Sequence, residues 1–107
     1  MQGAGVIIVE DESIIAMDIE VVLGQRGYRV LATVSDADEA VLKTGELSPD
    51  IVLMDIVLDG DKSGIEAAQR ITALYDVPVL FVTSHADEHT VRLARETGPY
   101  GYILKPV

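Results

Sequence analysis

Four short apolar runs in this sequence each end at a charged or hydroxyl-bearing residue, and this repetition constrains the fold more than any other feature. The residues at these ends are Glu10 with Asp11, Asp55, Thr83 and Lys105. In a parallel α/β sheet the carboxyl ends of the strands share one edge, where ligands bind, so residues that end successive strands become neighbours. We therefore predict that three carboxylates, a hydroxyl and an ammonium group converge.

This combination of groups predicts a cation site. Carboxylates that are packed together repel one another and resist ionisation unless a cation lies among them. A hard divalent cation with oxygen ligands is the natural occupant of such a cluster. The sequence therefore predicts a site for Mg²⁺ (or Mn²⁺) together with a phosphoryl group.

The length and charge of the chain narrow the function classes. A chain of 107 residues corresponds to one domain, and its net charge of -10 opposes direct contact with nucleic acid or an anionic membrane. We find no cysteine, no apolar run long enough to span a bilayer and no basic leader followed by an apolar core. We expect a cytoplasmic protein whose DNA-binding output, if it has one, lies elsewhere.

Strand-like and helix-like segments alternate along the chain with short connections. The expected strands are 6–9, 28–34, 51–54, 79–82 and 101–104. Several of these runs are continuously apolar, as in strands that are buried on both faces of a parallel sheet. The order βαβαβαβαβ, with right-handed crossovers, favours an open parallel α/β sheet.

Local signals position the expected helices. Ser13 is the predicted N-cap of the first helix, and Gly27 is expected to end it. Its predicted apolar face consists of Ile15, Ile19 and Val22.

Three further helices are expected. Asp36 and Glu39 form the pattern of a capping box at the start of the second helix. The third helix is expected to begin at Gly64, and a short fourth helix is expected over residues 87–98. The inward side chains predicted for the second helix are Ala37, Ala40, Val41 and Thr44, and those for the third are Ile65, Ala68 and Thr72.

Four motifs at the predicted strand ends resemble those of a known family. They are Val-Glu-Asp-Glu at 9–12, Leu-Met-Asp at 53–55, Val-Thr-Ser at 82–84 and Tyr-Ile-Leu-Lys-Pro at 102–106. In order and spacing, and over essentially the whole chain, they resemble the receiver domain of two-component response regulators. The resemblance implies a flavodoxin-like, doubly wound, five-stranded parallel sheet with the strand order 2-1-3-4-5, formed as one domain by residues 1–107.

The resemblance also implies a role for each residue of the cluster. Asp55 matches the phosphoacceptor, whose carboxylate attacks phosphorus to form an aspartyl phosphate. Asp11 matches the direct Mg²⁺ ligand, Glu10 acts beside it through a bound water, and Asp55 and the backbone carbonyl of Val57 complete the set of protein ligands. Lys105 matches the lysine that pairs with the acceptor carboxylate and then with a phosphoryl oxygen.

Two further residues match the family's conformational switch. Thr83 matches the hydroxyl that moves to bond the phosphoryl group, and Tyr102 matches the aromatic residue whose inward rotation follows. The implied partners are a histidine kinase or a histidine phosphotransfer protein, with an output or sensor domain in the same or another chain. Such a module is not an enzyme beyond its own phosphorylation and dephosphorylation.

Two alternatives stay open beside the phosphoacceptor function. One is a degenerate receiver that serves only as a docking or dimerisation module. The other is a Mg²⁺-dependent aspartyl-phosphate phosphatase, which would need a second aspartate where Val57 stands. A dinucleotide-binding enzyme is disfavoured, because Gly3 and Gly5 precede the first strand and the turn over residues 10–13 that follows it has no glycine.

The sequence departs from the family pattern in two places. The loop between Asp55 and Gly64 is one residue longer than in common receivers, and its Asp59 and Asp61 are interpreted as a solvated acidic turn. In addition, the family's fifth helix would follow Pro106, close to where the sequence ends. We expect this to leave one apolar sheet face uncovered, which predicts either a homodimer that buries it or a marked loss of stability relative to a chain extended through that helix.

Overall fold

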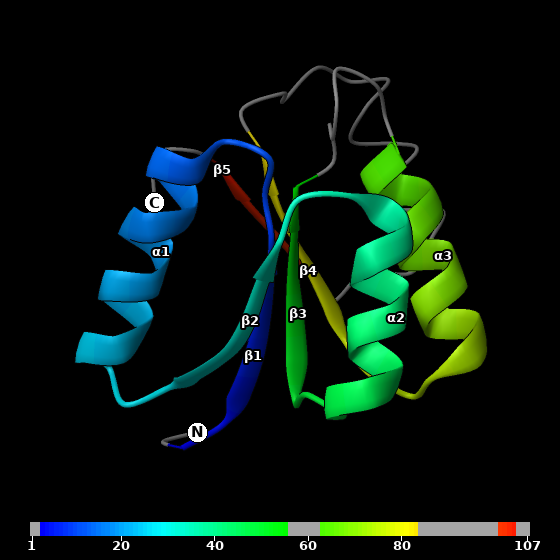
Figure 1. Cartoon of the computed structure of the whole chain (residues 1–107), viewed down its shortest axis with the longest axis horizontal. Coiled ribbons are helices and arrows are strands. Elements are labelled where there is room, and N and C mark those ends of the chain that lie inside the picture. Colours follow the sequence, from blue (N-terminus) through cyan, green and yellow to red (C-terminus); the bar gives the residue numbers. More distant parts are fainter. Residues whose placement is uncertain (1–2, 56–62, 84–100, 105–107) are drawn as a thin grey trace.

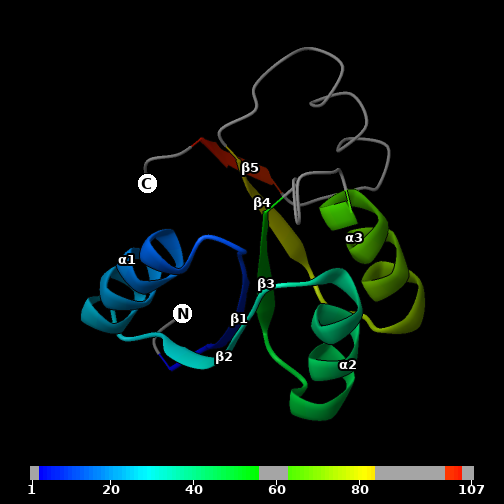
Figure 2. The ribbon, with the colours of Figure 1, turned by 45° about the horizontal axis from the view of Figure 1, so that its top comes forward.

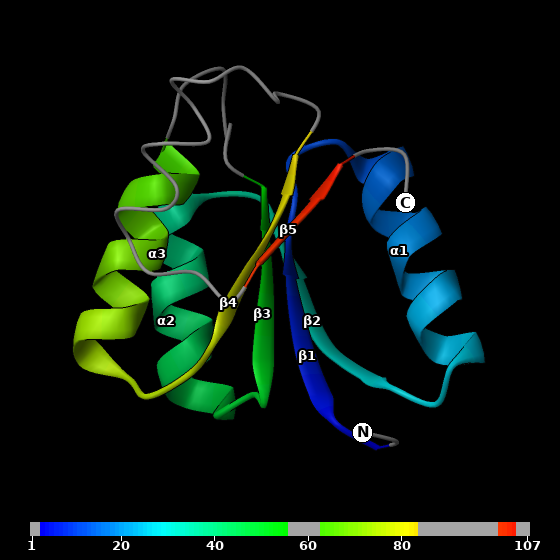
Figure 3. The ribbon, with the colours of Figure 1, turned by 180° about the vertical axis from the view of Figure 1, so that it is seen from behind.

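Five parallel strands form one sheet in the order β2-β1-β3-β4-β5. The strands are β1 (Gly5–Val9), β2 (Arg29–Val34), β3 (Ile51–Asp55), β4 (Val79–Thr83) and β5 (Gly101–Leu104). The structure is a computed structural model that describes residues 3–55, 63–83 and 101–104. The predicted flavodoxin-like α/β sheet and its strand order are confirmed, and Figure 3 shows β5 beside β4.

Within the described residues, three helices flank the sheet on its two faces (Figures 1 and 2). They are α1 (Ser13–Gln25), α2 (Ala37–Leu47) and α3 (Ser63–Leu74). Helix α1 lies on one face, whereas α2 and α3 lie together on the other (Figure 1). The helix predicted over residues 87–98 lies outside the described residues. No helix in the described part of the chain is both long and apolar enough to cross a membrane.

Successive side chains of β1 alternate between two separate apolar cores. Ile7 and Val9 belong to the core beneath α2 and α3, which also holds Phe81 of β4. Val6 and Ile8 belong to the core beneath α1. Because both faces of β1 are buried, every side chain of the strand is apolar, and the first polar groups occur where the strand ends.

The start of α1 differs from the sequence prediction by one residue, whereas Gly27 ends the helix as predicted. Ser13 is the first helical residue, whereas the N-cap is Glu12, whose backbone is extended and whose side chain makes no capping bond. The predicted serine cap is therefore wrong, because the chain leaving β1 stays extended through Glu12. At the other end, Gly27 has a φ of 87° and allows Tyr28 N to donate to Leu23 O at 3.0 Å. This bond explains why β2 begins after Tyr28.

Helix α2 follows the sequence prediction closely. Asp36 is its N-cap, and its Oδ1 accepts a 2.8 Å hydrogen bond from the backbone N of Glu39. The buried side chains are Ala40, Val41 and Thr44. The helix ends at Ser48, which has a left-handed backbone with a φ of 48°.

Helix α3 corrects two predictions. It begins at Ser63, one residue before Gly64. Thr72 is exposed and its hydroxyl donates to Ala68 O at 2.9 Å, whereas Ile71 is fully buried in its place. Positions 71 and 72 both lie near the same helix face as Ala68, and the apolar side chain takes the buried position since it loses no hydrogen bonds to water there.

The Asp36 cap provides a stability test of the α2 assignment. We expect Asp36→Ala to lower the free energy of unfolding by about 1 kcal/mol, because the Glu39 N–H loses its acceptor. Asp36→Asn keeps an acceptor at this position and should cost clearly less. Urea unfolding of the three proteins measures the difference, and equal losses in both variants would contradict the role of the cap.

Candidate functional site

The strand register brings the carboxyl ends of β1, β3 and β4 level with one another. Val9 pairs with Met54, so the residues that follow them, Glu10 and Asp55, lie beside each other at the same edge. Asp55 in turn pairs with Val82 on β4. The parallel arrangement therefore gathers side chains that are 45 positions apart in the sequence, as the sequence pattern predicted.

The register extends the same edge to β5. Thr83 pairs with Leu104, and Phe81 pairs with Tyr102 two positions earlier. The backbone positions of Thr83 and Tyr102 thus lie on adjacent strands. Lys105 follows Leu104 directly in the sequence but lies outside the described residues.

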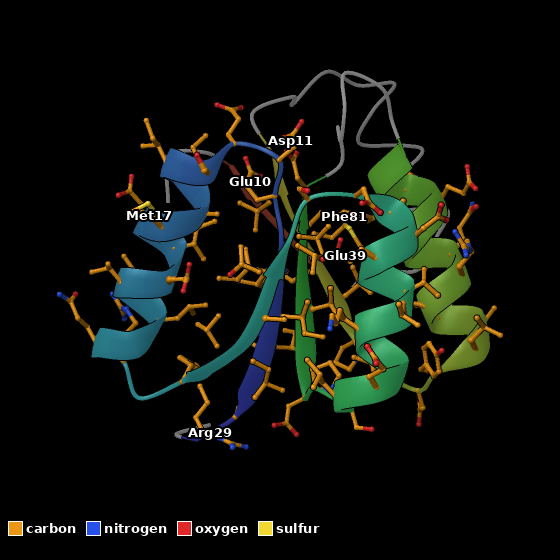
Figure 4. All side chains as sticks on the ribbon, in the orientation of Figure 1. Glu10, Asp11, Met17, Arg29, Glu39 and Phe81 are labelled. Atoms are coloured by element: carbon orange, nitrogen blue, oxygen red, sulfur yellow. The ribbon has the colours of Figure 1, made fainter. Side chains whose placement is uncertain are left out.

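Three carboxylates meet at this edge. Glu10, Asp11 and Asp55 each offer one oxygen atom, and these atoms all lie within 4.8 Å of one another. Glu10 and Asp55 are both only 4% exposed, whereas Asp11 is exposed. Figure 4 shows Glu10 and Asp11 where β1 leaves the sheet toward α1.

Backbone geometry holds the cluster in position. The backbone N of Glu10 donates to Val34 O at 2.9 Å, which ties the end of β1 to the end of β2. The chain then passes through Asp11 and Glu12 into α1. The positive end of the α1 dipole therefore lies two residues from Asp11 and favours negative charge there.

The donor set fits a hard divalent cation. Mg²⁺ is bound through one or two carboxylates, keeps several waters and takes further ligands from phosphoryl oxygens. Two nearly buried carboxylates and one exposed carboxylate supply the anionic oxygens and leave one side accessible to solvent. A cation among them would offset the mutual repulsion of the three charges.

An acidic groove adjoins the cluster and was missed in the sequence analysis. It has a volume of about 280 Å³, and its lining includes Glu10, Asp11, Met17, Glu20 and Glu39. Glu39 was interpreted only as part of a capping box, and no periodicity or motif distinguishes Glu20. Only the packing of α1 and α2 around the end of β2 brings these carboxylates to one groove.

Several predicted site residues lie outside the described part of the chain. The carbonyl of Val57 and the side chain of Lys105 are among them, as are Asp59 and Asp61 of the acidic turn. For Thr83 and Tyr102 the structure describes the backbone alone. The roles of all these residues stay predictions.

The comparisons with known proteins all indicate the same family. The chain matches the family described as response regulator receiver domain over residues 6–107. It is 34% identical over 101 residues to the transcriptional regulatory protein PdtaR of Mycobacterium tuberculosis, covering 94% of this chain and 49% of PdtaR. It is 35% identical over 102 residues to the transcriptional regulatory protein LiaR of Bacillus subtilis, covering 94% of this chain and 48% of LiaR. The chain thus spans about half the length of these curated relatives.

A solved structure of a receiver domain supports the same family. The signal receiver domain of a modulated diguanylate cyclase from Desulfovibrio desulfuricans G20 superposes with a TM-score of 0.91 at 40% identity. The match covers 99% of this chain and 84% of that chain. A receiver domain 40% identical in sequence therefore has the same fold.

Neighbouring acids at the start of α1 allow a test of metal binding. We expect Asp11→Ala to weaken Mg²⁺ binding by at least about tenfold, since even the outer partners of metal ligands typically contribute that much. Glu12→Ala should leave the affinity nearly unchanged, because Glu12 is exposed and is not one of the three clustered carboxylates. Calorimetric titration with MgCl₂ measures both variants, and equal losses would indicate general surface charge in place of a site.

Proposed function

Because this chain belongs to the response regulator receiver domain family, we propose that Asp55 accepts a phosphoryl group from a phosphohistidine and that this changes a partner-binding surface. Members of the family are signalling modules of two-component systems. The observation that carries the proposal is the cluster of Glu10, Asp11 and Asp55, whose carboxylate oxygens lie within 4.8 Å of one another. Residues 1–107 would form the receiver domain, acting in the cytoplasm.

The proposed reaction transfers a phosphoryl group from a histidine nitrogen of the donor to a carboxylate oxygen of Asp55. A carboxylate oxygen of Asp55 attacks phosphorus, the bond from phosphorus to the donor nitrogen breaks, and the imidazole leaves with the electron pair. The product is an aspartyl phosphate, and attack by water later releases inorganic phosphate and restores the carboxylate. The reaction changes only the protein's own Asp55, so no other catalytic activity is proposed.

The residues around Asp55 have distinct proposed roles. Asp11 would bind Mg²⁺ directly, Glu10 would hold it through water, and Asp55 and the backbone carbonyl of Val57 would be further ligands. When bound, Mg²⁺ supplies positive charge that neutralises the transferring phosphoryl group. Lys105 supplies a second positive charge from the end of β5.

The burial of the cluster supports this proposal. Glu10 and Asp55 are nearly excluded from water, and electrostatic interactions are stronger where water is excluded. Fixed charges at the sheet edge also need no rearrangement when the phosphoryl group arrives. An ordinary strand end exposed to solvent would lack both properties.

The proposed partners follow from the reaction and from the relatives. A histidine kinase or a histidine phosphotransfer protein would donate the phosphoryl group. Since the chain spans about half of PdtaR and LiaR, an output or sensor domain in the same or another chain would use the signal.

A homodimer is also proposed, through the sheet face beneath α1. An apolar groove of about 280 Å³ lies there, with Val6, Leu23, Leu53 and Leu80 in its lining. A second copy that covers this face would remove apolar surface from water.

Phosphorylation at Asp55 can be tested directly. With Mg²⁺ and acetyl phosphate, we expect the protein to gain one acid-labile phosphoryl group, and Asp55→Asn should abolish the gain. Intact-mass spectrometry measures the labelling, with Asp50→Asn as the matched control because Asp50 lies at the opposite end of β3. Equal labelling of wild type and Asp55→Asn would overturn the assignment, and no labelling of either would favour a docking module without phosphorylation.

The proposed switch couples Thr83 to Tyr102. We expect a beryllofluoride phosphoryl mimic to shift the NMR resonances of Tyr102, because the Thr83 hydroxyl moves toward the bound group and the two backbones lie on adjacent strands. Thr83→Ala should suppress this shift, whereas Thr72→Ala on the exposed face of α3 should not. An unaltered Tyr102 signal in wild type, or an equal shift in Thr83→Ala, would count against the switch.

A further inference from the structure

Helices α2 and α3 meet along an exposed seam that contains none of the phosphoryl-transfer residues. They lie side by side on one face of the sheet (Figures 1 and 3). They run in the same direction, because each leads from the end of one strand to the start of the next parallel strand. Near the helix starts, Arg70 Nη1 donates to Asp38 Oδ1 at 2.7 Å. Toward the helix ends, the side chain of Tyr75 lies against Gly45. These two contacts define the α2–α3 seam.

Two exposed leucines lie on the α2–α3 seam between these contacts. Leu42 follows Asp38 by one helical turn and is 59% exposed. Leu74 follows Arg70 by one turn and is 63% exposed. Since the helices run parallel and Asp38 contacts Arg70, the next turn brings Leu42 and Leu74 to neighbouring positions. This exposed apolar pair removes no surface from water in the isolated domain.

Close packing holds the α2–α3 seam in one shape. A Cβ atom on residue 45 would come too close to the Tyr75 hydroxyl, so the glycine at this position allows Tyr75 to rest on the backbone of α2. The Asp38–Arg70 bond joins the helices at the other end of the seam. A surface that is fixed in this way loses little conformational freedom when a partner covers it.

Charges of both signs surround the α2–α3 seam. Lys43 lies 3.5 Å from Glu46, and Arg70 lies 2.7 Å from Asp38. These two basic residues are half of the lysines and arginines in the described part of the chain, whereas the sequence of α1 contains acidic residues and no basic one. Because the whole chain has a net charge of -10, two copies repel each other. The repulsion is weaker where basic residues compensate the acidic ones.

A second copy fits this pattern when it is turned about a two-fold axis that passes midway between Leu42 and Leu74. An axis perpendicular to the seam lays α3 of one copy over α2 of the other and reverses its direction. Leu42 of each copy then meets Leu74 of the other. Arg70, four residues before Leu74, meets Glu46, four residues after Leu42, so opposite charges face each other. The Arg70 and Glu46 side chains are 41% and 52% exposed.

The same charge pattern disfavours other occupants of the seam. Membrane-binding helices carry an excess of Lys and Arg beside their apolar face, and nucleic acid is bound by basic residues that neutralise its phosphates. Here each basic residue beside the leucines has an acidic neighbour. A second copy supplies charges of both signs in the reversed order.

We propose that the α2–α3 seam is an interface between two copies of this chain. In this interface the Leu42–Leu74 pairs of the two copies stack, and Arg70 of each copy pairs with Glu46 of the other. The inference goes beyond the proposed function, because the seam lies on the opposite face of the sheet from the homodimer contact proposed beneath α1. The small apolar centre with charged surroundings is typical of a reversible interface.

Matched leucine variants test the location of the interface. We expect the mass of the wild-type protein in light scattering to rise with concentration. Leu42→Ser and Leu74→Ser should each weaken this association by about fivefold or more, as truncation of a central contact does. Leu47→Ser should not, because Leu47 is 40% exposed but lies on another side of α2. All three leucines are exposed, so the thermal melts should match wild type.

Charge reversals test the two-fold arrangement in a mixture of variants. Arg70→Glu alone and Glu46→Lys alone should each associate more weakly than wild type, because like charges then meet at both ends of the interface. An equal mixture of the two variants should recover association, since the reversed charges attract each other across the two copies. A mixture of Glu46→Lys with Arg26→Glu serves as the control and should not recover, because Arg26 follows α1, away from the seam.

Several results would overturn the proposal. A wild-type protein that stays monomeric at every concentration is one, and a mixture of Arg70→Glu with Glu46→Lys that recovers no more association than the Arg26→Glu control is another. Equal association of wild type, Leu42→Ser and Leu74→Ser would also exclude the seam, and would assign the dimer to another face such as the one beneath α1.

Discussion

The mutual repulsion of three carboxylates at one sheet edge is the constraint on which the rest of the structure depends. Glu10, Asp11 and Asp55 bring oxygen atoms within 4.8 Å of one another, although two of them are almost completely buried. Carboxylates this close together resist ionisation unless a cation lies among them, so the backbone has to hold them in place. The parallel pairing of β3 with β1 on one side and with β4 on the other aligns the strand ends through backbone hydrogen bonds.

The two apolar cores make this alignment rigid. Val6 and Ile8 are held on the α1 side of β1 while Ile7 and Val9 are held on the other, so a slip of one residue would exchange every side chain between the cores. The register of β1 is therefore fixed by the packing on both of its faces. Both faces of β1 are buried by apolar side chains, so its interior carries no polar side chain. The carboxylates of the candidate site therefore lie where the strands end.

Helix α1 connects the site to the surface of the molecule. It begins two residues after Asp11, buries Ile19 against the sheet and presents Met17 to solvent. An apolar face toward solvent has no role in folding, since it removes no surface from water in the isolated domain. Helix α1 therefore both supports the sheet end that holds the carboxylate cluster and carries exposed apolar side chains.

The sequence pattern alone predicted the parallel sheet, the Asp36 cap and the meeting of the three carboxylates, because continuous apolar runs and strand-end polar residues report directly on a parallel sheet. The strand order followed from the resemblance to the receiver family. The sequence predicted the wrong N-cap for α1 and the wrong buried residue in α3, where neighbouring positions satisfy the same helical period and only packing chooses between them. Tertiary structure alone brought Glu20 and Glu39 to one groove. Periodicity defines the faces of a helix, but the neighbours that pack against it decide which face is covered.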